Sequence, residues 1–150
     1  MLKLSRKVEY ALMALMHMAR LRRGELAAAR AISTQHDIPA DLLGKVLQNL
    51  ARAGLVASVQ GAGGGYRLAR EFDAITLGEV IEAVEGPVHL AVCRDDPAAC
   101  SQYENCNIKG PVSHLQDQLV QYIHAVKLSE FNGTAPSTSS GQADAAWPTA

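Results

Sequence analysis

Residues 61–65 contain four glycines in five positions, and this run constrains the fold more than any other part of the chain. The runs on either side, residues 55–59 and 66–68, have the composition of short strands, so the pattern predicts a β-hairpin. A glycine-rich run can also be the phosphate-binding loop of a nucleotide-binding protein. That loop ends in Gly-Lys-Ser/Thr and lies between a strand and a helix. Neither condition is met here, so we interpret residues 55–68 as a glycine-rich hairpin.

Helices are predicted before this hairpin at about residues 5–21, 27–36 and 39–53. Ser5 is a good N-cap for the first helix, and Gly54 ends the third. Between the second and third helices, Pro39 forces a turn, because a residue before proline avoids the α-helical region. The third helix has an expected buried face made of Leu42, Leu43, Val46, Leu47 and Leu50. Helix, turn, helix and hairpin in this order predict a winged helix, and a generic three-helix core is the alternative.

In a winged helix the third helix enters the major groove of DNA. Lys45 and Gln48 face away from the expected core and carry donors that suit guanine and adenine edges. Asp41 can accept from cytosine or simply cap the helix. Gly44 lies mid-helix, where glycine costs about 1 kcal/mol relative to alanine. Close approach to DNA and tight packing against another helix are equally good reasons for it.

The hairpin supplies a second set of candidate DNA contacts. Glycines let backbone N–H groups approach phosphates closely, and the flanking polar side chains can touch phosphate or the minor groove. The candidates are Gln60, Gly63, Gly64, Tyr66 and Arg67.

The two halves of the chain have opposite charge. Residues 1–70 hold eleven Lys and Arg against four Asp and Glu, a net charge of +7, whereas residues 71–150 carry −8. A polyanion would be attracted by the first half and repelled by the second. The pattern favours nucleic acid as the partner of the N-terminal half, although charged runs are often only solvated surface.

The chain has three cysteines, Cys93, Cys100 and Cys106, spaced C-x6-C-x5-C. Three thiols cannot all pair in disulfides, but three thiolates hold most of a metal or iron–sulfur site if a fourth ligand comes from elsewhere. A DNA reader attached to such a site suggests a sensor coupled to transcription. The alternative is three ordinary core cysteines.

The C-terminal half has two further helix signals. Thr76-Leu77-Gly78-Glu79 matches a capping box, and Pro111 is expected to begin a helix with an apolar stripe at Val112, Leu115, Leu119, Tyr122 and Val126. This heptad-like stripe suits a partner's equivalent helix in a homodimer, or packing on the chain's own domain.

We therefore predict a mainly α fold with a small β-hairpin, a winged helix-turn-helix followed by a long C-terminal dimerisation helix. The expected regions are a DNA-binding domain at 1–72, a cysteine loop and dimerisation helix at 73–131, and a disordered tail at 132–150. No apolar run is long enough to span a membrane and no signal peptide is evident, so we expect a cytoplasmic protein. No nucleophile motif or His–acid metal spacing supports an enzyme with a small-molecule substrate.

Several segments together resemble the Rrf family of bacterial regulators over residues 2 to about 130. These are Leu4-Ser5, Glu9-Tyr10-Ala11-Leu12, Ala53-Gly54-Leu55-Val56, the Gly61–Tyr66 wing, Thr76-Leu77-Gly78-Glu79-Val80-Ile81 and the three cysteines after them. The resemblance implies a homodimeric winged-helix regulator that binds double-stranded promoter DNA. It also implies that Cys93, Cys100 and Cys106 bind an iron–sulfur cluster whose state sets DNA binding, most plausibly in a repressor of iron–sulfur, iron or nitrosative-stress genes.

The chain departs from the family's branches in ways that bear on the site. Lys109 replaces the histidine ligand of the iron–sulfur branch, and Gln60 replaces an arginine that reads the minor groove. In the nitric-oxide-sensing branch an acidic residue on the partner's first helix completes the site. Glu9 has the matching position, so we hypothesise that it reaches iron across the dimer; a surface glutamate is the alternative. The x6 spacing leaves [2Fe-2S] and [4Fe-4S] both open.

Two other interpretations remain. In one, the DNA-binding regulator carries a thiol–disulfide switch in place of a cluster. In the other, the chain is a small zinc or electron-transfer protein whose basic half binds a protein partner.

Overall fold

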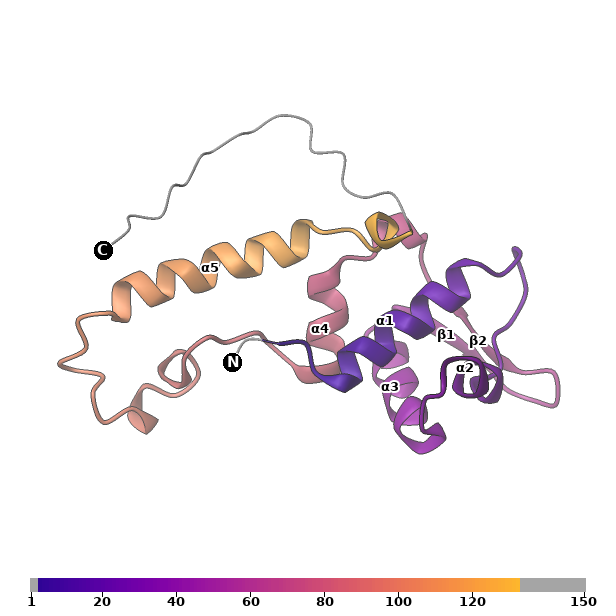
Figure 1. Cartoon of the computed structure of the whole chain (residues 1–150), viewed down its shortest axis with the longest axis horizontal. Coiled ribbons are helices and arrows are strands. Elements are labelled where there is room, and N and C mark those ends of the chain that lie inside the picture. Colours follow the sequence, from indigo (N-terminus) through magenta and orange to yellow (C-terminus); the bar gives the residue numbers. More distant parts are fainter. Residues whose placement is uncertain (1–2, 133–150) are drawn as a thin grey trace, which may run out of the picture.

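The computed structural model describes residues 3–132, in the element order expected for a winged helix (Figure 1). The helices are α1 (Arg6–Ala19), α2 (Ala29–His36), α3 (Ala40–Arg52), α4 (Leu77–Glu85) and α5 (Lys109–Ala125), and the strands are β1 (Val56–Val59) and β2 (Gly65–Leu68). Short 3-10 helices lie at Phe72–Ala74, Val92–Arg94, Pro97–Ala99 and Leu128–Phe131. The mainly α fold with one small hairpin is confirmed. None of the helices in residues 3–132 is long and apolar enough to cross a membrane.

Helices α1, α3 and α4 contact one another around one hydrophobic core, which α2 also joins. From α3 the core receives Leu43, Val46, Leu47 and Leu50, which recur at helical spacing and are almost completely buried. Leu42, also expected there, is only half-buried because it lies at the edge of this stripe. The buried stripe fixes the rotation of α3 about its axis and so determines which face it presents to solvent.

The hairpin is a two-stranded antiparallel sheet in which Val56 pairs with Leu68 and Val59 with Gly65. Ala27 extends it through two backbone hydrogen bonds with Tyr66, each 2.8 Å long. A β-carbon on Gly65 would lie 2.6 Å from the Ala27 carbonyl oxygen, so close approach of two backbones requires glycine there.

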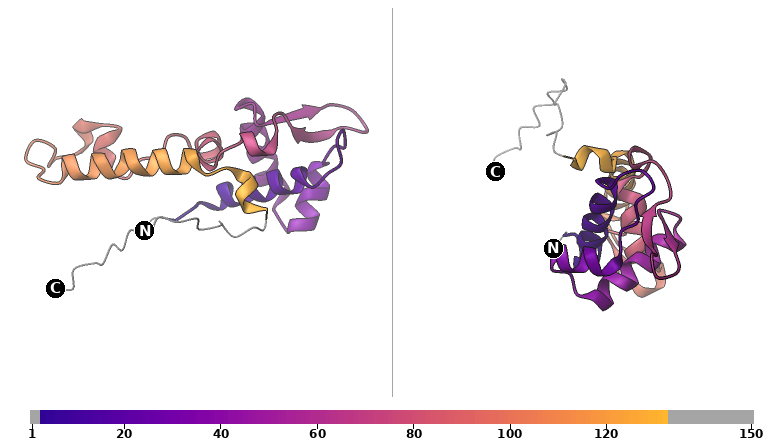
Figure 2. Two further views of the ribbon diagram at one scale, coloured as in Figure 1. Left: turned by 90° about the horizontal axis from the view of Figure 1, so that it is seen from above. Right: turned by 90° about the vertical axis from the view of Figure 1, so that its right-hand side faces the viewer.

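Helix α5 and residues 87–108, which we call the cysteine loop, run side by side and project from the winged helix as an arm (Figures 1 and 2). The C-terminal end of α5 is tied down. A β-carbon on Gly78 of α4 would lie 2.6 Å from the His124 ring, and His124 Nε2 lies 3.1 Å from Glu82 Oε1. The backbone of Leu128 donates to Ile75 at 2.9 Å. The N-terminal end of α5 therefore lies at the far end of the arm.

Some predicted boundaries were wrong. The first helix ends at Ala19 rather than near residue 21, and the second begins at Ala29 because Ala27 pairs with the hairpin. Helix α3 begins at Ala40 rather than at residue 39, because Pro39 is its N-cap and lies outside the helical backbone region. Helix α5 begins at Lys109, before Pro111, which is tolerated because first-turn N–H groups lack intrahelical partners. The capping box at Thr76 is confirmed, whereas residues 133–150 of the expected tail lie outside the described residues.

Candidate functional site

The outer face of α3 presents Asp41, Lys45 and Gln48 to solvent, as the sequence predicts. Asp41 lies in the first turn but is not the N-cap, which is Pro39 without a side-chain hydrogen bond. The three side chains follow one another at intervals of four and three residues, so they lie on one face of the helix. That face can supply acceptors from Asp41 and Gln48 and donors from Lys45 and Gln48 to a groove.

Gly44 lies on the same helix, between these side chains. Apart from its two chain neighbours and the backbone of its own helix, a β-carbon added to it would meet no atom of the described residues within 4 Å. Of the two reasons that the sequence left open, tight packing against another helix is therefore contradicted within residues 3–132. Gly78 of α4 is the contrasting case, because α5 packs so closely there that a β-carbon would collide with the His124 ring.

The hairpin residues divide into two groups. Gln60, Gly63 and Arg67 are exposed. Gly64 and Tyr66 have roles inside the fold: a β-carbon on Gly64 would collide with the Val59 carbonyl oxygen, and Tyr66 packs half-buried against the core. Only the first group offers side chains or open backbone to an outside partner.

A cavity lies at the base of the hairpin, between β2 and the loop that joins α1 to α2. It has a volume of about 440 Å³ and is lined by four arginines, Arg22, Arg23, Arg67 and Arg70, together with Glu25 and Glu71. Of these four arginines the sequence predicts a role only for Arg67. Arg22 and Arg67 are 45 residues apart, and no local pattern in the sequence indicates that they lie close together in the fold.

One of these arginines links the hairpin base to α4. Arg70 lies 2.7 Å from Glu79, the residue that completes the capping box with Thr76. Burial of the Glu79 carboxyl raises its pKa, but the hydrogen bonds from Arg70 and Thr76 outweigh burial and leave the pKa lowered. The charged carboxylate is thus the form that holds the hairpin base to α4.

Cys93, Cys100 and Cys106 are all free and half-buried in the cysteine loop. Cys93 lines a cavity of about 300 Å³ between this loop and α5, together with Arg94, Tyr103 and Lys109. Three thiols suit an iron–sulfur cluster as a donor set. In residues 3–132, however, no three Cys, His, Asp or Glu side chains are grouped closely enough to hold a metal. The three thiols therefore match an iron–sulfur cluster in chemistry, but within one chain they are not close enough together to bind it.

Lys109 is engaged within the loop. Its amine donates to the Tyr103 carbonyl oxygen at 3.3 Å and lies 4.1 Å from the centre of the Tyr103 ring. These contacts span Cys106 and hold the loop against the first turn of α5. The lysine at this position is therefore a brace for the loop.

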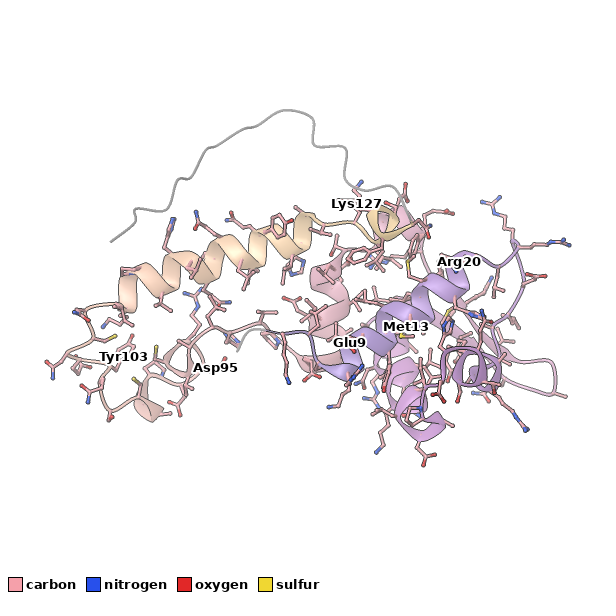
Figure 3. All side chains as sticks on the ribbon, in the orientation of Figure 1. Glu9, Met13, Arg20, Asp95, Tyr103 and Lys127 are labelled. Carbon is pink, nitrogen blue, oxygen red and sulfur yellow. The ribbon has the colours of Figure 1, made fainter. Side chains whose placement is uncertain are left out.

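Glu9 lies on α1, away from Tyr103 at the far end of the arm (Figure 3). Its carboxylate is 3.0 Å from Arg6 and partly exposed. Glu9 and the cysteines of the same chain are thus not brought together. Whether Glu9 reaches the partner's loop stays a prediction.

The expected apolar stripe of α5 is uncovered at two of its five positions, whereas Val112, Leu119 and Val126 are half-buried and Val126 follows the end of the helix. Leu115 is 55% exposed and Tyr122 is 68% exposed. The face of α5 that contacts its own chain contains Gln116 and Ile123 instead. The stripe therefore remains available to another molecule.

Gln116 is the site-region residue that sequence reasoning missed. Its buried side-chain amide donates to the Val88 carbonyl oxygen, and its carbonyl accepts from the Leu90 N–H at 2.7 Å. A glutamine within an apolar helix pattern gives no signal of such a role. Its effect is to tie the start of the cysteine loop to the middle of α5.

A second unpredicted contact joins α1 to α2. His17 Nδ1 lies 3.2 Å from His36 Nε2. Burial, followed by the nearby His36 and Arg20, lowers the pKa of His17. The pair braces the helix-turn-helix and lies outside the cysteine site.

Comparison with known proteins places this architecture among bacterial regulators. The family Rrf2, described as "Iron-dependent Transcriptional regulator", matches residues 4–132. A putative HTH-type transcriptional regulator of Aquifex aeolicus is 32% identical over 126 residues, covering 83% of this chain and 87% of that protein. The HTH-type transcriptional regulator IscR of Escherichia coli O1:K1 / APEC is 30% identical over 130 residues, covering 87% and 80%.

Among solved structures, CymR of B. subtilis, described as the global cysteine regulator, has a TM-score of 0.68 and 28% identity, covering 87% of this chain and 96% of that one. These relatives are transcription regulators, not enzymes, so the expectation that the chain is not an enzyme is confirmed.

Proposed function

Because this chain belongs to the Rrf2 family of transcriptional regulators, we propose that it is a homodimeric repressor whose affinity for promoter DNA depends on the state of Cys93, Cys100 and Cys106. The observation that carries the proposal is the position of three free thiols on the loop that joins α4 to α5 and is tied to α5 through Gln116. A chemical change at the thiols acts on the element that connects the dimer helix to the DNA reader.

In this proposal, α3 enters the major groove with Lys45 and Gln48 donating to base edges and Asp41 accepting from cytosine. The exposed hairpin residues Gln60, Gly63 and Arg67 approach phosphate or the minor groove. Gly64 and Tyr66 act indirectly, Gly64 by permitting the tight hairpin turn and Tyr66 by packing the hairpin against the core.

The homodimer forms along the uncovered stripe of α5. The exposure of Leu115 and Tyr122 supports this assignment, because exposed apolar stripes on helices mark interaction sites. Two-fold symmetry then places two α3 helices for two half-sites of a palindromic operator.

The cofactor in this proposal is an iron–sulfur cluster held by the thiolates of Cys93, Cys100 and Cys106. The family description as iron-dependent and the donor chemistry support it. Glu9 of the partner subunit supplies the fourth ligand, since Glu9 of the same chain lies away from Tyr103 in the loop (Figure 3). When bound, the cluster supplies iron and sulfide that react with oxygen or nitric oxide. A carboxylate ligand exchanges more readily than a thiolate, which suits a sensor.

A thiol switch is the second candidate, and the 28% identity to CymR, described as the global cysteine regulator, favours it. Two of the three thiols would form a disulfide by giving two electrons and two protons to an oxidant. The third thiol would stay free. This version keeps the same DNA reader and the same dimer.

In either case the signal travels through the arm. Gln116 holds the start of the cysteine loop on α5, and α5 is tied to α4 by His124 against Gly78 and Glu82. A rearrangement of the loop shifts α5 relative to the winged helix. It thereby changes the spacing of the two α3 helices, which lowers affinity without altering any base contact.

The test is iron and acid-labile sulfide per protomer in anaerobically purified protein, with the visible spectrum and affinity for a promoter duplex. Near-stoichiometric iron and sulfide, lost in Cys93→Ser, Cys100→Ser and Cys106→Ser, support the cluster. Absent sulfide together with oxidation-dependent DNA binding supports the thiol switch. Absent DNA binding in every state contradicts both and revives the small zinc or electron-transfer protein.

The fourth ligand has its own experiment. Glu9→Ala is expected to make the cluster less stable and to change its spectrum, whereas Glu104→Ala, which removes an exposed carboxylate from the loop itself, leaves both unchanged. Mixed dimers of Glu9→Ala with a triple cysteine-to-serine chain distinguish a ligand from the same subunit and one across the dimer. If Glu9→Ala retains the wild-type spectrum and stability, Glu9 is a surface glutamate.

A further inference from the structure

The middle of α3 carries a glycine whose side-chain space is empty. Apart from its chain neighbours and its own helix backbone, no atom of the described residues lies within 4 Å of a β-carbon added to Gly44, whereas one added to Gly78 in α4 would lie 2.6 Å from the His124 ring. Glycine in a helix interior is less stable than alanine, because it loses more backbone freedom on folding. Nothing within residues 3–132 explains why residue 44 is not alanine.

The empty space lies on the exposed face of α3. Asp41 precedes Gly44 by three residues and Gln48 follows by four, so both side chains border it on the same face. Both are exposed, while Leu43 and Leu47 beside Gly44 point into the core and are fully buried. We call this gap, bounded by Asp41 and Gln48, the Gly44 notch.

We propose that the Gly44 notch receives the edge of a DNA base pair, and that Gly44 determines specificity by having no side chain. This inference rests on the proposed DNA-binding function. A missing β-carbon lets the helix backbone lie closer to the groove floor, where an apolar group such as a thymine methyl fits without a polar partner. The net charge of +7 on residues 1–70 favours DNA as the occupant over the same basic half of a second copy of the chain.

The notch and the side chains beside it act together. A β-carbon at residue 44 would project from the face that carries Asp41, Lys45 and Gln48. It would hold the helix away from the groove and lengthen the hydrogen bonds of its neighbours. Hydrogen bonds weaken steeply with such misalignment, so one methyl group affects several contacts.

The experiment compares Gly44→Ala with wild-type full-length protein in two measurements, thermal unfolding and affinity for DNA. The specific probe is a duplex that wild-type protein selects from randomised short duplexes, and the reference probe is an unselected duplex. We expect Gly44→Ala to raise the melting temperature by a few degrees, to bind the selected duplex about tenfold more weakly, and to bind the reference duplex unchanged. Gly44→Leu is expected to abolish preference for the selected duplex.

Gly110→Ala is the matched control. Gly110 lies in α5 and its added β-carbon also meets no atom within 4 Å, so this substitution changes helix propensity away from α3. It is expected to leave both affinities unchanged. A repeat selection with Gly44→Ala should alter the preferred base at one position of each half-site and leave the others as they were.

The outcomes separate this inference from the proposed function. If wild-type protein selects no duplex, the DNA-binding function itself fails. If wild-type protein selects a duplex and Gly44→Ala binds it equally well, the notch receives no base edge. Size-exclusion chromatography shows whether Gly44→Ala changes the oligomeric state. If it does, while the affinity for the selected duplex per dimer is unchanged, the space around Gly44 belongs to a protein contact and the proposal is overturned.

Discussion

The winged helix, residues 6–85, buries seventeen of the eighteen side chains of the main hydrophobic cluster, whereas residues 87–125 of the arm bury only Gln116 and Ile123. Both regions pair polar groups: the winged helix in the capping box at Thr76, and the arm in the Arg94–Asp117 pair, whose atoms lie 2.7 Å apart. The arm leaves Leu115 and Tyr122 exposed and its thiols half-buried. The difference shows that the winged helix has its own hydrophobic core within one chain, whereas the arm buries few side chains and leaves apolar surface exposed.

The largest expected effect is on the core of the winged helix. Leu47→Ala is expected to lower the free energy of unfolding by about 2–5 kcal/mol, because it leaves a cavity under α3. The matched truncation in the arm, Val92→Ala, removes a side chain that is 67% exposed and is expected to change stability by less than about 0.5 kcal/mol. Urea unfolding followed by circular dichroism at fixed protein concentration measures both. Equal losses would mean that the arm is as tightly packed as the reader.

The next effect concerns the uncovered stripe of α5. Tyr122 is exposed in the single chain and would be buried in the proposed dimer. Tyr122→Ala is therefore expected to weaken dimerisation by about 2–4 kcal/mol, because tyrosines at the centre of an interface carry much of the binding energy. Sedimentation velocity over a dilution series measures the dimer dissociation constant. Gln121→Ala, an exposed neighbour outside the stripe, serves as the control. A dimer unaffected by Tyr122→Ala would place the interface elsewhere.

The third effect is on DNA binding by α3, which these substitutions change without touching the arm. Lys45→Ala or Gln48→Ala is expected to cost about 1–3 kcal/mol in specific DNA binding if each side chain donates to a base edge. Fluorescence anisotropy with the selected and unselected duplexes gives the difference. Lys127→Ala removes the same charge far from α3, beside the C-terminal end of α5, and should alter neither affinity (Figure 3). Unchanged binding in both α3 variants would move the readout to the hairpin or to DNA shape.

The smallest effect is the pH dependence of the link between hairpin base and α4. The pKa of Glu79 in the folded state is lowered from its ordinary value of 4.5, so the unfolded chain binds a proton first as pH falls. The stabilisation is complete above about pH 4.5 and is lost as pH falls through the lower folded pKa. For a partly exposed pair it amounts to about 0.2–1 kcal/mol.

Melting temperatures of wild type and Glu79→Gln from neutral pH downward test this link. The wild type is expected to be the more stable protein at neutral pH, and the two curves should converge in acid. Parallel curves would show that the Arg70–Glu79 pair contributes no stability that depends on protonation.

Much of the winged helix follows from local rules that are visible in the sequence. The glycine run predicts the hairpin, Thr76 and Glu79 predict a capping box, and the apolar spacing of α3 predicts its buried face. The boundaries that differ do so through tertiary contacts. Ala27 leaves the second helix because its backbone pairs with Tyr66, and Tyr66 is drawn toward the core for the same reason.

The arm was less predictable because its contacts join residues that are distant in sequence. Gln116 holds Val88 and Leu90 across more than twenty residues, and Lys109 packs on Tyr103 through a loop without regular spacing. The cysteines were identifiable as a candidate donor set, since three clustered thiols cannot all pair in disulfides. Their arrangement was not, because no periodic pattern relates residues in an irregular loop.

The sequence by itself determined that this protein is a winged helix of the Rrf2 family with a basic reader and three cysteines, because turn, capping and periodicity signals act over a few residues. Only the tertiary structure decided which face of α5 is uncovered and that the space beside Gly44 is empty. Both depend on which surfaces the rest of the chain covers, and burial by distant residues leaves no mark on the local sequence.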